Sequence, residues 1–244
     1  PKMIRKTTYI VIFITIFISF GFLNLKERND VENDKFVSYI VNPKKQKLEF
    51  FWKNAKGENY KNAENLILWL KTKNRKLIFS TNGGMYKKDN SPQGLYIENG
   101  IKKAEIDTSN GNGNFYLKPN GIFYLTTEKE PKICETKKNQ DNGKIKYATQ
   151  SGPMLILNGE IHSAFKKESV NLNIRNGVGI LPNNQIIFAM SKNEINFYEF
   201  AEYFKKMGCK NALYLDGFVS RTYLPEKNWK QLDGNFGVII GVTE

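Results

Sequence analysis

Residues 196–217 read NFYEFAEYFKKMGCKNALYLDG, and this stretch predicts an amphipathic helix followed directly by a buried strand. Asn196 and Glu199 stand at the spacing of an N-terminal capping box. Aromatic and apolar side chains then recur every three or four residues, which is the period of a helix with one buried face. Gly208 follows as a stop signal. A helix with this pattern must pack its apolar face on a sheet.

The strand predicted after this helix is the apolar run 212–215, which ends abruptly at Asp216 and Gly217. Glycine permits close approach of the backbone, so a carboxylate is expected at a strand end beside an open position. A turn-forming aspartate is the ordinary alternative. Nevertheless, a carboxylate in this place is the first candidate for chemistry.

Asparagine-glycine pairs dominate the middle of the chain and predict tight hairpin turns. These pairs are Asn99-Gly100, Asn120-Gly121 and Asn158-Gly159, and residues 182–184 separate two further apolar runs in the same manner. Most of the sheet should therefore be antiparallel. The predicted fold class is α+β, with a largely antiparallel or mixed β-sheet and a few packed helices.

The segment before this region predicts the start of the folded domain. Residues 38–41 and 47–52 have strand character and are expected to pair across the turn at residues 42–43. Asn62 is a candidate N-cap for a helix, and a further strand is expected at residues 77–79.

The N-terminus resembles an export segment. Three basic residues among the first six precede an apolar, uncharged run at residues 9–23. We expect residues 1–25 to be a signal peptide or a signal anchor, residues 26–35 to be a linker and residues 36–244 to be the domain. The basic flank favours a cytoplasmic N-terminus, so the domain should lie outside the cytoplasm, secreted or tethered to the membrane.

The charge of the chain favours anionic partners. It has 37 Lys and Arg against 24 Asp and Glu, a formal net charge of +13. The lysines are scattered without the arginine-rich stripe of a nucleic-acid reader, so we expect no nucleic-acid partner. A solvated lysine-rich surface is the simplest interpretation, and an anionic glycan substrate is compatible with it.

The composition excludes several kinds of chemistry. His162 is the single histidine, so a histidine-based zinc site is excluded. Neither a phosphate-binding glycine loop nor a dinucleotide fingerprint is present. Cys134 and Cys209 have no metal-site or redox spacing and are expected to be unpaired thiols. We expect no cofactor. A divalent ion held by Asp216 is the alternative, but the sequence around Asp216 has no carboxylate cluster at the spacing that holds calcium or magnesium. Carboxylate, arginine, amide and backbone chemistry remain.

Five motifs stand in the order in which the phosphodiester glycosidase family has them, and the chain from about 79 to 242 resembles that family. The motifs are Asn82-Gly-Gly-Met-Tyr86, Pro92-Gln-Gly-Leu95, Gln150-Ser-Gly-Pro-Met-Leu155, Arg175-Asn-Gly-Val-Gly179 and Asn211-Ala-Leu-Tyr-Leu-Asp-Gly217. Taken singly, each has an ordinary interpretation as a turn, a bend or a surface charge. The resemblance implies an exported bacterial hydrolase that cleaves a glycosyl phosphodiester at the anomeric carbon. Phe218-Val-Ser220 departs from the animal members, where further glycines are usual, so the same sugar is not implied.

The resemblance also implies roles for particular residues. A phosphate monoester leaves well without a protonating acid, so one carboxylate can suffice, and Asp216 is the candidate nucleophile or water-activating base. Arg175 would bind the diester, and His162 would act as a proton shuttle or be structural. The candidate substrate-binding residues, which supply backbone N–H groups or polar side chains, are Asn82, Gly83, Gly84, Gln150, Ser151, Gly152 and Ser220. Asn82, Gln150, Arg175 and Asp216 are expected to line one cleft.

Two other classes of function remain open at the level of sequence. The same loops would serve a non-catalytic module that binds an anionic cell-envelope glycan, although a carboxylate in an anion pocket opposes binding. A membrane-tethered structural protein would not need the motifs to converge.

Overall fold

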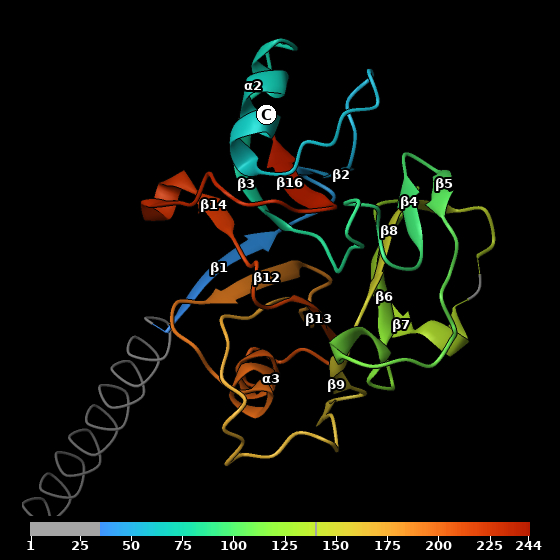
Figure 1. The fold of residues 1–244 in the computed structure, drawn as a ribbon, viewed down its shortest axis with the longest axis vertical. Coiled ribbons are helices and arrows are strands. Elements are labelled where there is room, and N and C mark those ends of the chain that lie inside the picture. Colours follow the sequence, from blue (N-terminus) through green and yellow to red (C-terminus); the bar gives the residue numbers. More distant parts are fainter. Residues whose placement is uncertain (1–34, 140) are drawn as a thin grey trace, which may run out of the picture. The chain divides into compact units, whose positions relative to one another are not determined.

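Three β-sheets surround a shared apolar core in the residues that the computed structural model describes, 35–139 and 141–244 (Figure 1). The strand pairs with a defined register are antiparallel in every sheet. The first sheet has the order β1 (Phe36–Val41), β12 (Ile186–Ser191), β11 (Asn176–Ile180), β13 (Ala212–Asp216), β9 (Met154–Leu157) and β10 (Glu160–Ile161). The second has the order β15 (Trp229–Lys230), β14 (Thr222–Leu224), β3 (Leu77–Asn82), β16 (Ile239–Thr243) and β2 (Lys47–Phe51). The third has the order β5 (Ile101–Ala104), β4 (Tyr96–Glu98), β8 (Ile145–Ser151), β6 (Gly121–Thr126) and β7 (Pro131–Glu135).

Aromatic side chains from all three sheets form the centre of the core. Phe79 of the second sheet lies 5.3 Å, between ring centroids, from Phe188 of the first. Phe188 in turn meets Phe123 of the third sheet at 5.9 Å. Each such ring removes a large apolar area from water, and this burial is the main force that holds the sheets together.

Two α-helices of the described chain cover the sheets. Helix α2 (Ala63–Lys71) begins after Asn62, whose side chain accepts the Asn65 N–H at 3.0 Å, and it buries Leu66 and Leu70 against the second sheet. Neither helix of the described chain is long and apolar enough to cross a membrane.

Helix α3 (Phe197–Lys206) packs on the first sheet, as the sequence predicts, and has the expected capping box. The close approach of α3 to the first sheet depends on glycines in β11. A Cβ atom at Gly179 would lie 2.7 Å from both the Phe204 ring and the Cys209 sulfur. Cys209 is buried and both cysteines are free, which confirms that they are unpaired.

Most of the predicted turns are confirmed. Asn99-Gly100 joins β4 to β5, and Asn158-Gly159 joins β9 to β10, with all four residues at positive φ. The prediction for Asn120-Gly121 is wrong, because Gly121 already pairs with Ser151 in the β6–β8 ladder. The Asn120 side chain instead donates to Phe115 O at 2.9 Å and closes the loop before β6.

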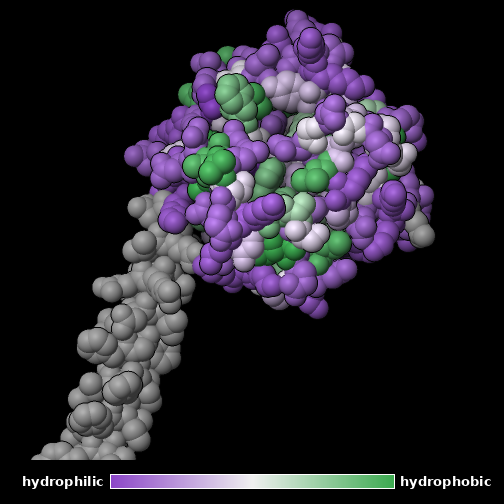
Figure 2. Space-filling model, turned by 60° about the horizontal axis from the view of Figure 1, so that its bottom comes forward, coloured by the Kyte–Doolittle hydropathy of each residue, from purple (hydrophilic) through white to green (hydrophobic). Residues whose placement is uncertain are grey.

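The first two strands are present, but their predicted pairing with each other is wrong. Strand β1 lies beside β12 in the first sheet, whereas β2 pairs with β16, near the C-terminus of the chain, in the second. Both partners are distant in sequence, so a local pattern cannot reveal them. The predicted export segment, 1–25, and all of the predicted linker except Lys35 lie outside the described residues. The face in Figure 2 is mainly hydrophilic, with hydrophobic groups in several separate places.

Candidate active site

Asp216 is the last residue of β13, and two hydrogen bonds to Asp216 and one to its neighbour Leu215 fix this end of the strand. The Gly217 N–H donates to its Oδ1 at 2.7 Å. The Ser220 hydroxyl donates to the carbonyl of Asp216 at 3.2 Å, and the Ser151 hydroxyl donates to the carbonyl of Leu215 at 2.9 Å. Two of the serines predicted to bind substrate therefore hold the end of the strand that carries the carboxylate.

The protein environment disfavours the charged form of Asp216. Burial raises the pKa of the Asp216 carboxyl from 3.8 to about 7, and this effect outweighs the opposing effects of the Gly217 N–H and the Asn82 amide. Burial, together with the nearby Asp216 charge, raises the pKa of the Tyr86 hydroxyl. A carboxyl with a pKa near neutrality is suited to act as a base or a nucleophile at physiological pH.

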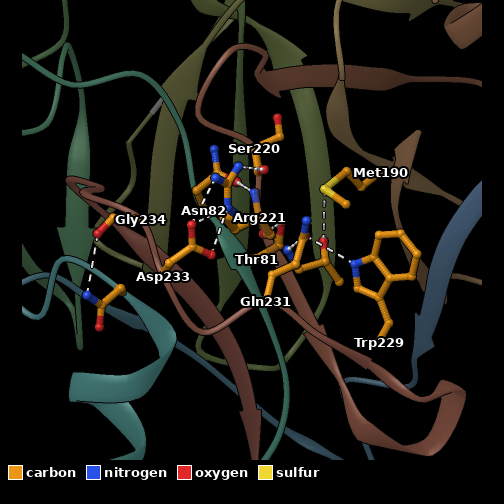
Figure 3. Close-up of polar contacts among 11 residues, drawn as sticks. Thr81, Asn82, Met190, Ser220, Arg221, Trp229, Gln231, Asp233 and Gly234 are labelled. Carbon is orange, nitrogen blue, oxygen red and sulfur yellow. Dashed lines mark hydrogen bonds and ion pairs between the residues drawn. The ribbon is translucent and has the colours of Figure 1, made fainter. Parts of the chain in front are cut away.

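Asn82 lies at the end of β3 and is completely buried. Its Oδ1 accepts the Asn176 Nδ2 at 2.9 Å and the backbone N–H of Arg221 at 3.2 Å. Figure 3 shows Asn82 beside Ser220 and Arg221. The Nδ2 of Asn82 has no hydrogen-bond partner of ordinary geometry in the described chain, yet it lies close enough to Asp216 to lower the pKa of that carboxyl. This buried donor therefore faces Asp216 and makes no other hydrogen bond among the described residues.

Arg221 is a cationic group near Asn82 that the sequence analysis missed, although it directly follows the candidate residue Ser220. Its Nε lies 2.9 Å from Asp233 Oδ1, and its Nη2 lies 2.9 Å from Asp233 Oδ2 (Figure 3). The Asp233 side chain is 66% exposed, so this ion pair contributes little to stability. An anionic ligand can therefore compete for the Arg221 guanidinium.

Arg175 has partners other than the expected diester. It is completely buried, its Nε donates to Ile195 O at 2.8 Å, and its Nη2 donates to Asn171 O at 2.8 Å. The guanidinium carbon lies 3.7 Å from the centre of the Phe197 ring. In this structure Arg175 ties a long loop to α3 and does not present its donors to a ligand.

Gln150 likewise uses its side chain within the protein. Its Oε1 accepts the N–H groups of Leu95 and Asp107, each at 2.9 Å, and its Nε2 donates to Asp107 O at 2.6 Å. Neither Gln150 nor Arg175 contacts Asp216 among the interactions of the described residues. Of the four side chains expected in one cleft, the pair that meets directly is Asn82 and Asp216, and the shared cleft stays a prediction.

His162 is locked in a neutral, structural arrangement. Its Nδ1 accepts the Ala164 N–H at 3.1 Å, so its Nε2 carries the hydrogen and donates to Lys118 O at 3.0 Å. Burial lowers the pKa of His162. The ring also stacks on Phe165, at 4.8 Å between ring centroids. A role as proton shuttle has no geometric support here.

The motif glycines allow close packing around the site. The Gly83 N–H donates to Val238 O at 2.8 Å. Gly84 has φ +134°, and a Cβ there would lie 2.8 Å from the Thr149 hydroxyl. A Cβ at Gly152 would lie 2.6 Å from the Cβ of Asn120. These close contacts explain why positions 84 and 152 are glycine. The binding of phosphate oxygens by the N–H groups of the motif glycines stays a prediction.

Phe218 projects from a tight turn directly after Asp216. The Ser220 N–H donates to Gly217 O at 2.8 Å and closes this turn. Val219 packs inward against the cluster under α2, whereas Phe218 is 90% exposed. A large apolar ring is thus held in solvent two residues from the candidate carboxylate.

The sequence profile of the phosphodiester glycosidase family matches residues 75–241, which span the whole of this site. The chain belongs to the phosphodiester glycosidase family. It is accordingly a glycosidase-type hydrolase, and the resemblance seen in the five motifs is confirmed.

Relatives and solved structures place the chain in this family and fold. An uncharacterized *Escherichia coli* K12 protein, YigE, is 36% identical over 188 residues, which cover 77% of this chain and 73% of the relative. The catalytic domain of the zebrafish N-acetylglucosamine-1-phosphodiester alpha-N-acetylglucosaminidase, auto-inhibited by its pro-peptide, superposes with a TM-score of 0.59 at 15% identity, over 85% of this chain and 83% of that domain. A putative exported protein from *Burkholderia pseudomallei* gives a TM-score of 0.53 at 9% identity, over 85% of this chain and 73% of that one. At such low sequence identities, the two superpositions show a shared fold and do not by themselves show a shared activity.

Proposed function

We propose that this phosphodiester glycosidase hydrolyses a sugar-1-phosphate diester at the anomeric carbon, with Asp216 as the catalytic carboxylate. The observation that carries the proposal is the Asp216 carboxyl at the end of β13, whose pKa lies near neutrality and which faces the buried Nδ2 donor of Asn82 at the end of β3. The donor of Asn82 suits an oxygen of the substrate, and the Asp216 carboxylate can attack the anomeric carbon as a nucleophile or accept a proton from a water molecule that attacks it.

The leaving group explains why one carboxylate is enough. Cleavage at the anomeric carbon releases a phosphate monoester, whose second pKa is about 6, so it departs without protonation by a second acid. Asp216 acts either as a nucleophile that forms a glycosyl ester or as a base that activates water. These routes are distinguished by the product, because a covalent intermediate retains the anomeric configuration and direct attack of water inverts it.

Three further groups are assigned to the substrate. Asn82 donates to an oxygen of the sugar or of the phosphate, and Arg221 supplies the positive charge for the diester after it releases Asp233. Phe218 contacts the apolar face of the sugar ring or its aglycone. Arg175 is assigned a structural role, since its donors are already used.

We also propose that the enzyme acts outside the cytoplasm. The proposal rests on the basic flank and apolar run of residues 1–25. The substrate would then be an anionic glycan or glycolipid of the cell envelope, and the membrane a partner through the N-terminal segment. Fractionation of cells that express the full chain tests this, and recovery in the cytosolic fraction would contradict it.

The central experiment incubates the full chain with a panel of sugar-1-phosphodiesters and measures free reducing sugar. We expect release by the wild type, with a rate that rises as the pH increases through about 7 and Asp216 ionises. Asp216→Asn should lower turnover by orders of magnitude, whereas Arg221→Gln should mainly raise KM. Asp89→Asn, at an exposed turn, is the matched control and should remain active. A fully active Asp216→Asn variant would refute the site.

A further inference from the structure

Asn82 and Asn176 form a buried amide pair that joins the first and second sheets. Asn176 is 1% exposed and Asn82 is 0% exposed. The Nδ2 of Asn176 lies 2.9 Å from the Thr81 hydroxyl, 3.0 Å from Asn82 O and 2.9 Å from Asn82 Oδ1. Asn176 is also the register partner of Asp216 in the β11–β13 ladder. Asn176 therefore belongs to β11, which lies beside the strand that carries Asp216. Its side chain contacts β3, the strand that ends at Asn82.

Backbone groups fix the orientation of both amides. The carbonyl of Asn82 can only accept, so the group of Asn176 that faces it is the Nδ2 donor. The Arg221 N–H can only donate, so the group of Asn82 that faces it is Oδ1. With its oxygen held between Asn176 and Arg221, Asn82 must direct its Nδ2 the other way. That is the side on which its amide affects Asp216.

We propose that Asn176 is a positioning residue, which holds the Asn82 amide with its donor toward Asp216 and the substrate. If the Asn82 amide rotated by half a turn, its oxygen would face the carboxylate, and two acceptors would repel each other. Asn176 opposes this rotation because it donates to the oxygen. The contact with substrate rests on the proposed function, whereas the arrangement around Asp216 does not depend on it.

Within the described part of the chain, two titratable side chains interact with the Asp216 charge. Tyr86, from the segment after β3, and Tyr214, on β13 itself, both feel its charge. Burial raises the pKa of each hydroxyl, so both tyrosines stay neutral while Asp216 titrates. The remaining partners are the Gly217 N–H and the Asn82 amide. A change in the titration of Asp216 after substitution of Asn176 therefore reports on Asn82.

The test is a double-mutant cycle read by carbon-13 NMR titration of the Asp216 carboxyl in the full chain. Asn82→Ala and Asn176→Ala should each raise its pKa, by about one pH unit. The double variant should give no larger shift than Asn82→Ala alone, because Asn176 acts through Asn82. Asn176→Leu fills the space of the amide and takes the place of Asn176→Ala in the cycle if the alanine variant does not fold. Asn196→Ala, which removes a buried amide that donates to Lys167 O at 2.9 Å, is the control and should leave the pKa unchanged.

Two results would overturn the proposal. One is a pKa of Asp216 that is unchanged in folded Asn176→Ala or Asn176→Leu. The other is a set of shifts that add in the double variant, which would show that Asn176 acts independently of Asn82. The titration needs no substrate, so it stays informative even if every diester in the activity panel fails.

Discussion

At the scale of single residues, the Asp216 charge is costly to the folded protein. Its pKa is about 7 in the folded state against an ordinary value of 3.8, so between these pH values the folded chain holds a proton that the unfolded chain releases. The contribution of this group to the free energy of unfolding therefore falls as the pH rises from about 4 to about 7. Above that window the full cost of burying the charge is present.

Asp216→Asn should consequently stabilise the protein at a pH of about 8. We expect a rise in Tm of roughly 2–4 °C, which corresponds to about 1 kcal/mol in a domain of this size. The gain should shrink as the pH falls and vanish below about pH 3, where Asp216 of the wild type is protonated in both the folded and the unfolded state. Calorimetry at several pH values measures the difference in Tm between the variant and the wild type. A variant less stable than wild type at a pH of about 8 would argue against a buried charge at Asp216.

Phe218 should affect the binding of substrate more than the rate of the chemical step. Its ring is exposed and makes no contribution to the core, so Phe218→Ala should raise KM about fivefold with kcat nearly unchanged. Phe218→Trp should preserve KM. Leu68→Ala, at a 56% exposed position on α2, is the matched control and should leave both constants alone. Equal constants for Phe218→Ala and wild type would exclude contact with the substrate.

The motifs could be read from the sequence, but the side chain that each contributes could not. Successive residues of a strand point to opposite faces. In the second half of β8, Ser151 reaches the end of β13, whereas its neighbour Gln150 bonds to Leu95 and Asp107. In the same way Asn176 meets Asn82 while Arg175 is buried against Phe197. The sequence analysis named both Gln150 and Ser151, but it chose Arg175 and missed Asn176, because only the register of the sheets shows which neighbour faces the site.

At the scale of elements, the contact between α3 and β11 depends on the absence of side chains. Gly179→Ala would place a Cβ 2.7 Å from both Phe204 and Cys209, which must then move. We expect a loss of about 1–3 kcal/mol in the free energy of unfolding, typical of an overpacked core. Chemical denaturation measures this loss. Lys205→Ala, which removes only an exposed ion pair with Glu160, should change the stability by less than about 0.5 kcal/mol.

Elements with local signals were predictable, and those with distant partners were not. The capping box of α3 and the turn at Asn158 depend on a few neighbouring residues, and both appear as expected. The pairing of β2 with β16 joins residues 47–51 to residues 239–243. Its specificity comes from the shared core, which no short window of sequence contains.

At the scale of the whole molecule, residues 37–244 should fold without the N-terminal segment. They form a compact unit with its own core. Deletion of residues 1–25 should therefore give a folded protein with a cooperative thermal transition and the same activity as the full chain. Circular dichroism and sedimentation test this, and aggregation of the shortened chain would mean that the apolar run packs inside the fold.

The convergence of all three sheets on the end of β13 has a kinetic consequence. Asn82 comes from the second sheet, Ser151 from the third and Asn176 from the first, so the geometry around Asp216 is complete only after the sheets have docked. Contacts between residues so far apart in sequence form late and slowly. During refolding from denaturant, far-ultraviolet circular dichroism should recover before hydrolysis does. The rate at which enzymatic activity recovers would thus report the rate of the last step of assembly, the docking of the sheets. Equal rates for circular dichroism and activity would contradict this order.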